Sequence, residues 1–108
     1  MNSVCLVGKL TRHPTTKFEG ESQQVTTFTL AVQEPSWEGK LYTLYVGCTS
    51  WGRAAETCSL LNAEDLIAVQ GKLAWQQRTG KCGQEHSLLV VNVRDVAVLD
   101  AAAVEVSA

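Results

Sequence analysis

The stretch Asp65–Gln84, DLIAVQGKLAWQQRTGKCGQ, determines the predicted fold. Its first half alternates apolar and polar residues, which is the period of a β-strand with one buried face. The shared apolar face consists of Ile67, Val69, Leu73 and Trp75. The second half is polar and runs into the turn-like segment GKCG at 80–83. We therefore predict a strand that forms part of a barrel wall and then projects beyond it, where its polar groups could bind another molecule.

Strand periodicity also covers residues 3–12, 24–34 and 87–99. The first of these segments is apolar on both faces up to Lys9, so we expect it to be buried on two sides or to lie in a subunit contact. Pro14 ends this strand, and Glu19 and Glu21 on either side of Gly20 are expected to form a solvated hairpin turn. The segment 34–40, EPSWEGK, has the composition of a hairpin tip.

The segment 41–51, LYTLYVGCTSW, is the most informative strand. One face is predicted to lie in the core, and it carries Tyr42, Leu44, Val46 and Cys48. The other face carries Thr43, Tyr45, Gly47, Thr49 and Trp51. Two aromatic rings on an otherwise small and polar face suggest a binding platform. A subunit contact is the alternative, because aromatic residues are also enriched at protein interfaces.

Residues 51–62, WGRAAETCSLLN, have the spacing of a short amphipathic helix that ends near Asn62. The order of elements is then three strands, one helix and two strands. We predict an all-β fold, a five-stranded Greek-key barrel of the OB-fold type with one short helix between strands 3 and 4. The predicted domain spans 1–100, and 101–108 form a short tail.

Four motifs occur in order along almost the whole chain, from about Asn2 to Leu99. They are NSVCLVGKLTRHP, FTLAVQ, WGRAAE and LIAVQGKL. Together they resemble the bacterial single-stranded DNA-binding protein (SSB) family. The resemblance implies a homotetramer of OB-folds that binds single-stranded DNA without sequence preference, in DNA replication, repair or recombination. It implies no catalysis and no cofactor, and it allows a longer SSB or replication proteins as partners.

The resemblance also implies which residues bind DNA. Aromatic residues of the family stack on bases at three places, which match Trp37, Tyr45 and Trp51. Cationic side chains would follow the phosphates, and the candidates are Lys9, Arg12, Lys17, Arg53, Lys72, Arg78 and Lys81. For Trp37, simple packing within its loop is the alternative. Trp75 has two interpretations, because it could stack on a base or pack at the edge of the core and along the projecting arm.

The chain departs from the family pattern in several places. Arg78 stands where the family usually carries an aromatic residue, and Ala74 and Gln76 occupy preceding positions that are usually basic. An arginine can still stack on a base. The family's long tail and acidic tip are missing after AAAVEVSA, so we expect a short member of the family or a shortened chain. These departures favour a second hypothesis, an OB-fold interaction protein with weak DNA affinity that acts through a protein partner.

The composition limits the functional classes. A chain of 108 residues with 45% hydrophobic content fits one soluble domain, and a net charge of −2 excludes a basic patch over the whole surface. No segment has the length of a membrane span or the pattern of a signal peptide, so a cytoplasmic location is expected. The four cysteines lack the close pairs typical of zinc sites and are expected to be small buried thiols, with Cys82 exposed in a loop. No arrangement typical of an enzyme is present.

Overall fold

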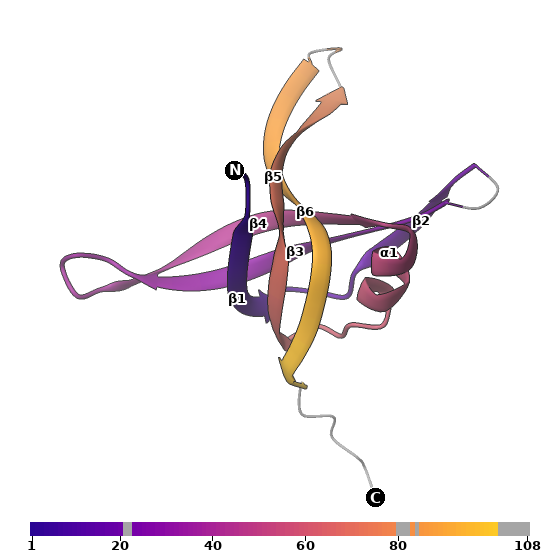
Figure 1. Ribbon diagram of the computed structural model, residues 1–108. Helices are drawn as coiled ribbons and strands as arrows, with labels where there is room; N and C mark the ends of the chain where they lie inside the picture. Colours follow the sequence, from indigo (N-terminus) through magenta and orange to yellow (C-terminus); the bar gives the residue numbers. More distant parts are fainter. Residues whose placement is uncertain (21–22, 80–82, 84, 102–108) are drawn as a thin grey trace, which may run out of the picture.

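The computed structural model describes residues 1–20, 23–79, 83 and 85–101. Its elements in chain order are β1 (Val4–Leu10), β2 (Thr15–Glu19), β3 (Gln23–Pro35), β4 (Leu41–Trp51), α1 (Gly52–Ser59), β5 (Leu66–Thr79) and β6 (Glu85–Asp100) (Figure 1). The predicted OB-fold is confirmed, and the short helix follows β4, the third of the five predicted strands.

Five of the strands close into a barrel. The sheet order is β1-β5-β6-β4-β3, and β1 pairs with β3 as well as with β5. The link between β4 and β6 is a short parallel pairing at Cys48 and Val91, whereas the other neighbours are antiparallel. Closure leaves each of the five strands with a neighbour on both sides in the barrel wall.

The prediction of five strands was incomplete, because β2 adds a sixth. It pairs with β3 in a hairpin and lies at the end of the sheet order. All five of its residues, TTKFE, are exposed, so the alternation of buried and exposed positions that reveals the other strands is absent. Hydrogen bonding to β3, rather than burial, defines this strand.

The core lies inside the barrel and under α1. Its buried members come from six of the elements and the loop after the helix: Leu10, Phe28, Leu30, Val32, Cys48, Cys58, Leu61, Ile67, Val69, Val91 and Val93. Two buried hydrogen bonds meet at Thr26 of β3, one to the helix and one to β4. The Thr26 hydroxyl donates to the Ala55 carbonyl oxygen at 3.0 Å, and the Ser50 hydroxyl donates to the Thr26 carbonyl oxygen at 2.9 Å.

Two glycines allow neighbouring strands to approach closely. A Cβ at Gly8 would meet the carbonyl oxygen of Ala31, and a Cβ at Gly71 would meet that of Asn92. Both contacts are with backbone, which cannot move aside as a flexible side chain can. The two glycines belong to the motifs LVGKL and VQGKL, so these motifs mark places where only glycine fits the barrel wall.

The β3–β4 hairpin and the β5–β6 arm extend beyond the barrel (Figure 1). For this reason part of the predicted core was wrong. Val46 and Cys48 pack in the core as expected, but Tyr42 and Leu44 on the same face are 48% and 44% exposed. Alternation assigned the face correctly, whereas the strand continues past the end of the core.

The predicted burial of the cysteines was also only partly right. Cys48 and Cys58 are buried as expected, but Cys5 is exposed, so its predicted burial was wrong. Cys5 and Val7 lie on the outer face of β1, and none of the residues that the structure describes covers this apolar face. The expectation for Cys82 lies outside the described residues.

Candidate nucleic-acid interface

The outer face of β4 carries the predicted platform residues. Tyr45 is 71% exposed and Trp51 is 38% exposed, while Thr43 is exposed between the barrel and the hairpin tip. Three hollows open one after another along this face, the first at Thr43 and Tyr45, the second at Gly47 and Thr49, and the third at Trp51. From Tyr45 to Trp51 the strand rises by about 20 Å.

The first hollow lies where β1 meets the β3–β4 hairpin. Its walls include Lys9, Ala31, Gln33 and Tyr45, and its volume is about 360 Å³. Tyr45 is directly opposite Ala31 in the β3–β4 ladder, so the small alanine side chain leaves one side of the phenol ring open. An aromatic ring and a lysine ammonium therefore border the same space.

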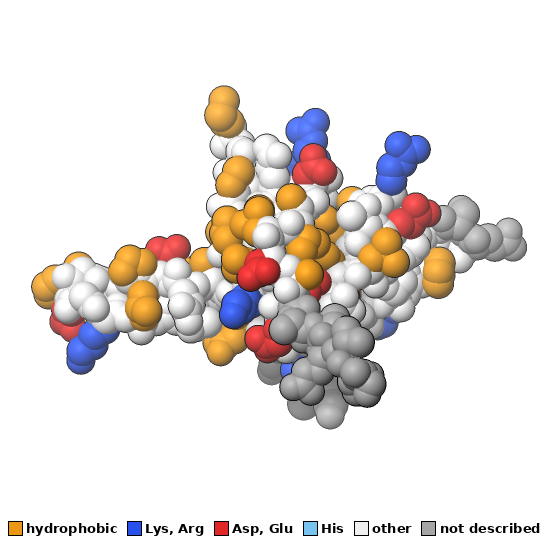
Figure 2. Space-filling model, turned by 90° about the horizontal axis from the view of Figure 1, so that it is seen from below, with side chains coloured by type: hydrophobic (Ala, Val, Ile, Leu, Met, Phe, Trp, Pro, Cys, Tyr) orange, Lys and Arg blue, Asp and Glu red, His pale blue; other side chains and the backbone are white. Residues whose placement is uncertain are grey.

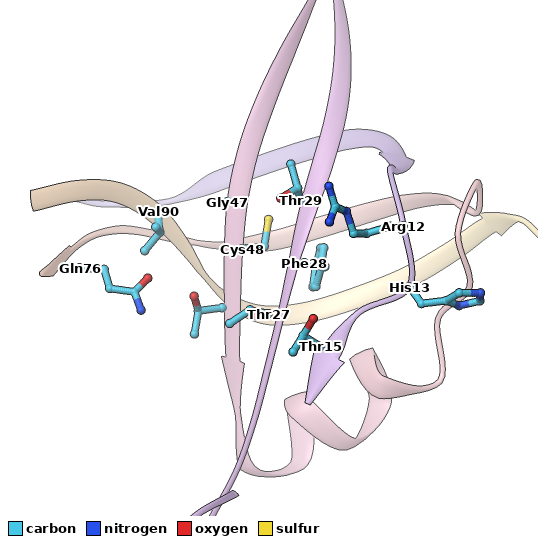
Figure 3. Close-up of a pocket in the computed structure, with 11 residues that line it drawn as sticks. Arg12, His13, Thr15, Thr27, Phe28, Thr29, Gly47, Cys48, Gln76 and Val90 are labelled. Carbon is cyan, nitrogen blue, oxygen red and sulfur yellow. The ribbon is translucent and has the colours of Figure 1, made fainter. Parts of the chain in front are cut away.

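The middle hollow is mainly polar and measures about 330 Å³ (Figure 3). Hydroxyl-bearing side chains contribute much of its lining, namely Thr15, Thr27, Thr29 and Thr49. The Arg12 side chain extends toward Thr29, whereas His13 points away from the other labelled residues (Figure 3). Within the part of the chain that the structure describes, the Gln76 Oε1 atom at this hollow is buried without a hydrogen-bond partner.

The third hollow is the largest of the three, about 670 Å³, and combines an aromatic ring with two cations. Trp51, Lys72, Asn92 and Arg94 all line it. Asn2 closes one side and is fixed by two hydrogen bonds with Leu73: its Nδ2 donates to the Leu73 carbonyl oxygen at 2.8 Å, and its Oδ1 accepts from the Leu73 amide at 2.9 Å.

The residue after Trp51 determines how β4 ends. Gly52 has φ +62°, a left-handed conformation that other residues adopt only at a cost. This conformation lets the chain pass directly from the strand into α1, whose first residue is Gly52. Trp51 is consequently held at the junction between a strand and a helix and does not lie in a loose loop.

The remaining predicted site residues are spread over the surface. Trp37 is 93% exposed at the β3–β4 hairpin tip, and Trp75 is 72% exposed on the β5–β6 arm. Lys17 on β2 and Arg53 on α1 are exposed and line none of the three hollows. The backbone of Arg78 pairs with His86 in the arm, but its side chain is not described, and Lys81 lies outside the described residues.

Sequence reasoning missed Asn92 and Arg94, which share the third hollow with Trp51. Both are polar residues two positions apart in an otherwise apolar strand, VVNVRDV, and that spacing places them on one face. This signal was available in the sequence. It did not reveal that the face belongs to the same hollow as Trp51, because β4 and β6 meet only through tertiary pairing.

The described residues contain neither a candidate metal site nor a helix that could span a membrane. No group of three or more His, Cys, Asp or Glu side chains among them could hold a metal ion. Among the same residues, α1 is far too short to cross a bilayer, and no helix meets the length and hydropathy that such a span requires. The features that do converge are aromatic rings, hydroxyl groups and cations.

Comparison with known proteins gives a consistent result. Residues 1–99 match the model of the Single-strand binding protein family. The "Single-stranded DNA-binding protein" of Caldanaerobacter subterraneus subsp. tengcongensis is 32% identical over 93% of this chain and 69% of its own length. That of Clostridium tetani is 33% identical over 93% and 71%, and "Single-stranded DNA-binding protein A" of Bacillus subtilis is 30% identical over 93% and 60%. The chain therefore belongs to the single-strand binding protein family.

Proposed function

We propose that this protein binds single-stranded DNA without sequence preference, along the outer face of β4, in DNA replication, repair or recombination. The observation that supports this most strongly is the exposure of Tyr45 and Trp51 on one strand face, each beside a hollow that also has a lysine in its wall. Family membership and the printed names of the relatives support the same ligand.

Base stacking suits such a binder because every base has a flat π-face. Each stacked base contributes roughly 1–3 kcal/mol by alanine substitution. Trp37 at the hairpin tip would extend the binding face beyond the barrel, since its ring is almost fully exposed. Cationic side chains near the hollows, Lys9, Arg12 and Lys72, would contact phosphates.

The direct test is a fluorescence titration with oligo-dT at low salt. Stacking on Trp37 and Trp51 is expected to quench tryptophan emission, and the variant with both tryptophans replaced by phenylalanine should lose most of the quenching. Unchanged wild-type emission at saturating DNA contradicts the proposal. Because the net charge is −2, we also expect the protein to contact only a few phosphates. The slope of log affinity against log salt concentration should then be shallow, at about −0.7 for each phosphate contacted.

We propose a homotetramer as the assembly that carries this face. Exposed apolar side chains support it, because monomers rarely leave large apolar patches uncovered. On the barrel these are Val7, Val98 and Leu99, and on the arm Trp75 is directly opposite Leu89 in the β5–β6 ladder. Figure 2 shows hydrophobic side chains gathered at the centre of one face and along the projecting β3–β4 hairpin.

This arrangement assigns Trp75 to packing between subunits. Its ring lies on the face of the arm that continues the core side of β5, opposite to the face that carries Lys72 and Gln76. Sedimentation should show a tetramer, and Trp75→Asp should shift the population toward smaller species. A wild-type monomer at micromolar concentration contradicts the proposed assembly.

The second candidate function is an interaction protein that keeps the oligomer and binds DNA weakly. The exposed apolar surface and the acidic net charge favour it. The two candidates differ in a gel-shift experiment. An intact oligomer without any DNA complex at micromolar protein would support the interaction protein, whereas a complex supports DNA binding.

A further inference from the structure

A β-bulge places Arg94 beside the hollow that contains Trp51. In the β5–β6 ladder Gln70 pairs with Asp95, whereas the next residue of β5, Gly71, pairs with Val93. Arg94 is therefore the extra residue on β6 and has no partner on β5. Bulges bend a strand, re-aim a side chain and are over-represented next to functional sites.

The charge around this hollow is one-sided. Lys72 and Arg94 both line it, and none of its lining residues is acidic. The neighbouring Asp95 lines a different hollow, together with Cys5 and Val96. Two cations that share a space without a carboxylate repel each other. An anion bound between them attracts both, and this attraction offsets the repulsion. The hollow is thus suited to a negatively charged group.

The aromatic ring in the same hollow specifies the kind of anion. Trp51 offers a stacking surface, and stacking combined with cations is how single strands are held without sequence readout. We propose that this hollow binds one nucleotide of the single strand, with its base on Trp51 and its phosphodiester between Lys72 and Arg94. The guanidinium of Arg94 can donate two parallel hydrogen bonds to phosphate oxygens. This inference rests on the proposed DNA-binding function.

The experiment measures oligo-dT affinity by fluorescence anisotropy at several salt concentrations. Removing one phosphate contact should reduce the slope of log affinity against log salt by about 0.7 and weaken binding about fivefold to tenfold at 0.05 M salt. We expect this for Arg94→Gln and, as a second neutral replacement, Arg94→Ser. Arg94→Lys should keep the wild-type slope because it keeps the charge.

The matched control is Gln23→Glu, which lowers the net charge by the same single unit at an exposed position of β3, outside the three hollows. It should leave the slope unchanged. Arg94 is exposed, so thermal melting should show that its neutral variants remain folded. If Arg94→Gln and Gln23→Glu change the slope equally, the effect is general electrostatics and the inference is overturned.

A double-mutant cycle tests whether one nucleotide uses both groups. The losses from Trp51→Ala and Arg94→Gln should be coupled, because each removes a contact to the same nucleotide. Strictly additive losses overturn the shared site. If wild type binds DNA and Arg94→Gln keeps its slope, only this inference fails. If wild type binds no oligo-dT at all, the proposed function fails and this inference falls with it.

Discussion

At the scale of single residues, the proposal depends on two aromatic rings on one face of β4. We predict that Tyr45→Ala and Trp51→Ala each weaken oligo-dT binding by roughly 1–3 kcal/mol, because each would remove one stacked base. The affinity change should be similar for oligo-dC, since stacking does not depend on base identity. Equilibrium titrations at one fixed salt concentration measure both.

The matched control for these variants is Tyr42→Ala. Tyr42 belongs to the same strand and is also exposed, but its side chain lies on the opposite face from Tyr45. Its removal should leave DNA affinity unchanged. If Tyr42→Ala weakens binding as much as Tyr45→Ala does, the assignment of the binding face is wrong.

The buried thiol of Cys48 predicts a pH dependence of stability. Burial raises the pKa of Cys48 from 9.0 to about 12, and the nearby Cys58 adds to the shift. In the unfolded chain the Cys48 thiol has its ordinary pKa of 9.0 and loses its proton around that pH. Its stabilising contribution is therefore complete below about pH 9 and is lost as the pH rises toward 12.

Urea denaturation of wild type and Cys48→Ala across pH 7–11 measures this effect. The variant is less stable at pH 7 because a buried side chain is truncated, but it lacks the alkaline loss. The difference in free energy of unfolding between the two proteins should therefore shrink above pH 9. If the difference in free energy of unfolding stays constant from pH 7 to pH 11, burial of the Cys48 thiol does not cause the alkaline loss of stability.

At the scale of elements, the bulged β5–β6 ladder depends on Gly71. A Cβ at this position would meet the backbone of Asn92, so Gly71→Ala should destabilise the protein by about 1–3 kcal/mol, the usual cost of overpacking. Gly47→Ala is the control, because its Cβ would make an ordinary contact at 3.6 Å with Val90. Equal stability of the two variants in thermal unfolding would contradict this reading of the bulge.

Some elements were predictable from the sequence and others were not, for physical reasons. Alternation found β4 and β5 because one face of each strand meets the core. The same rule failed for Tyr42 and Leu44, because alternation shows which face a residue is on but not where the core ends. It could not find β2, which buries nothing, or the bulge at Arg94, which depends on the register between two strands.

At the scale of the whole molecule, the order of elements and four motifs were sufficient for the barrel. The composition of the three hollows was beyond sequence reasoning. Each hollow combines residues from strands that are distant in sequence, such as Lys9 with Tyr45 or Trp51 with Arg94. Only barrel closure brings these pairs together. Predicting aromatic residues on one strand face is therefore easier than predicting the cations that accompany them.

The central claim is that the outer face of β4 contacts the single strand. Photocrosslinking with an oligo-dT that contains 5-iodouracil, followed by mass spectrometry of the peptides, tests it most directly. We predict crosslinks within residues 41–51, at Tyr45 and Trp51. Crosslinks confined to the apolar face of β1 and β6 around Val7 and Val98, with none on β4, would contradict the claim.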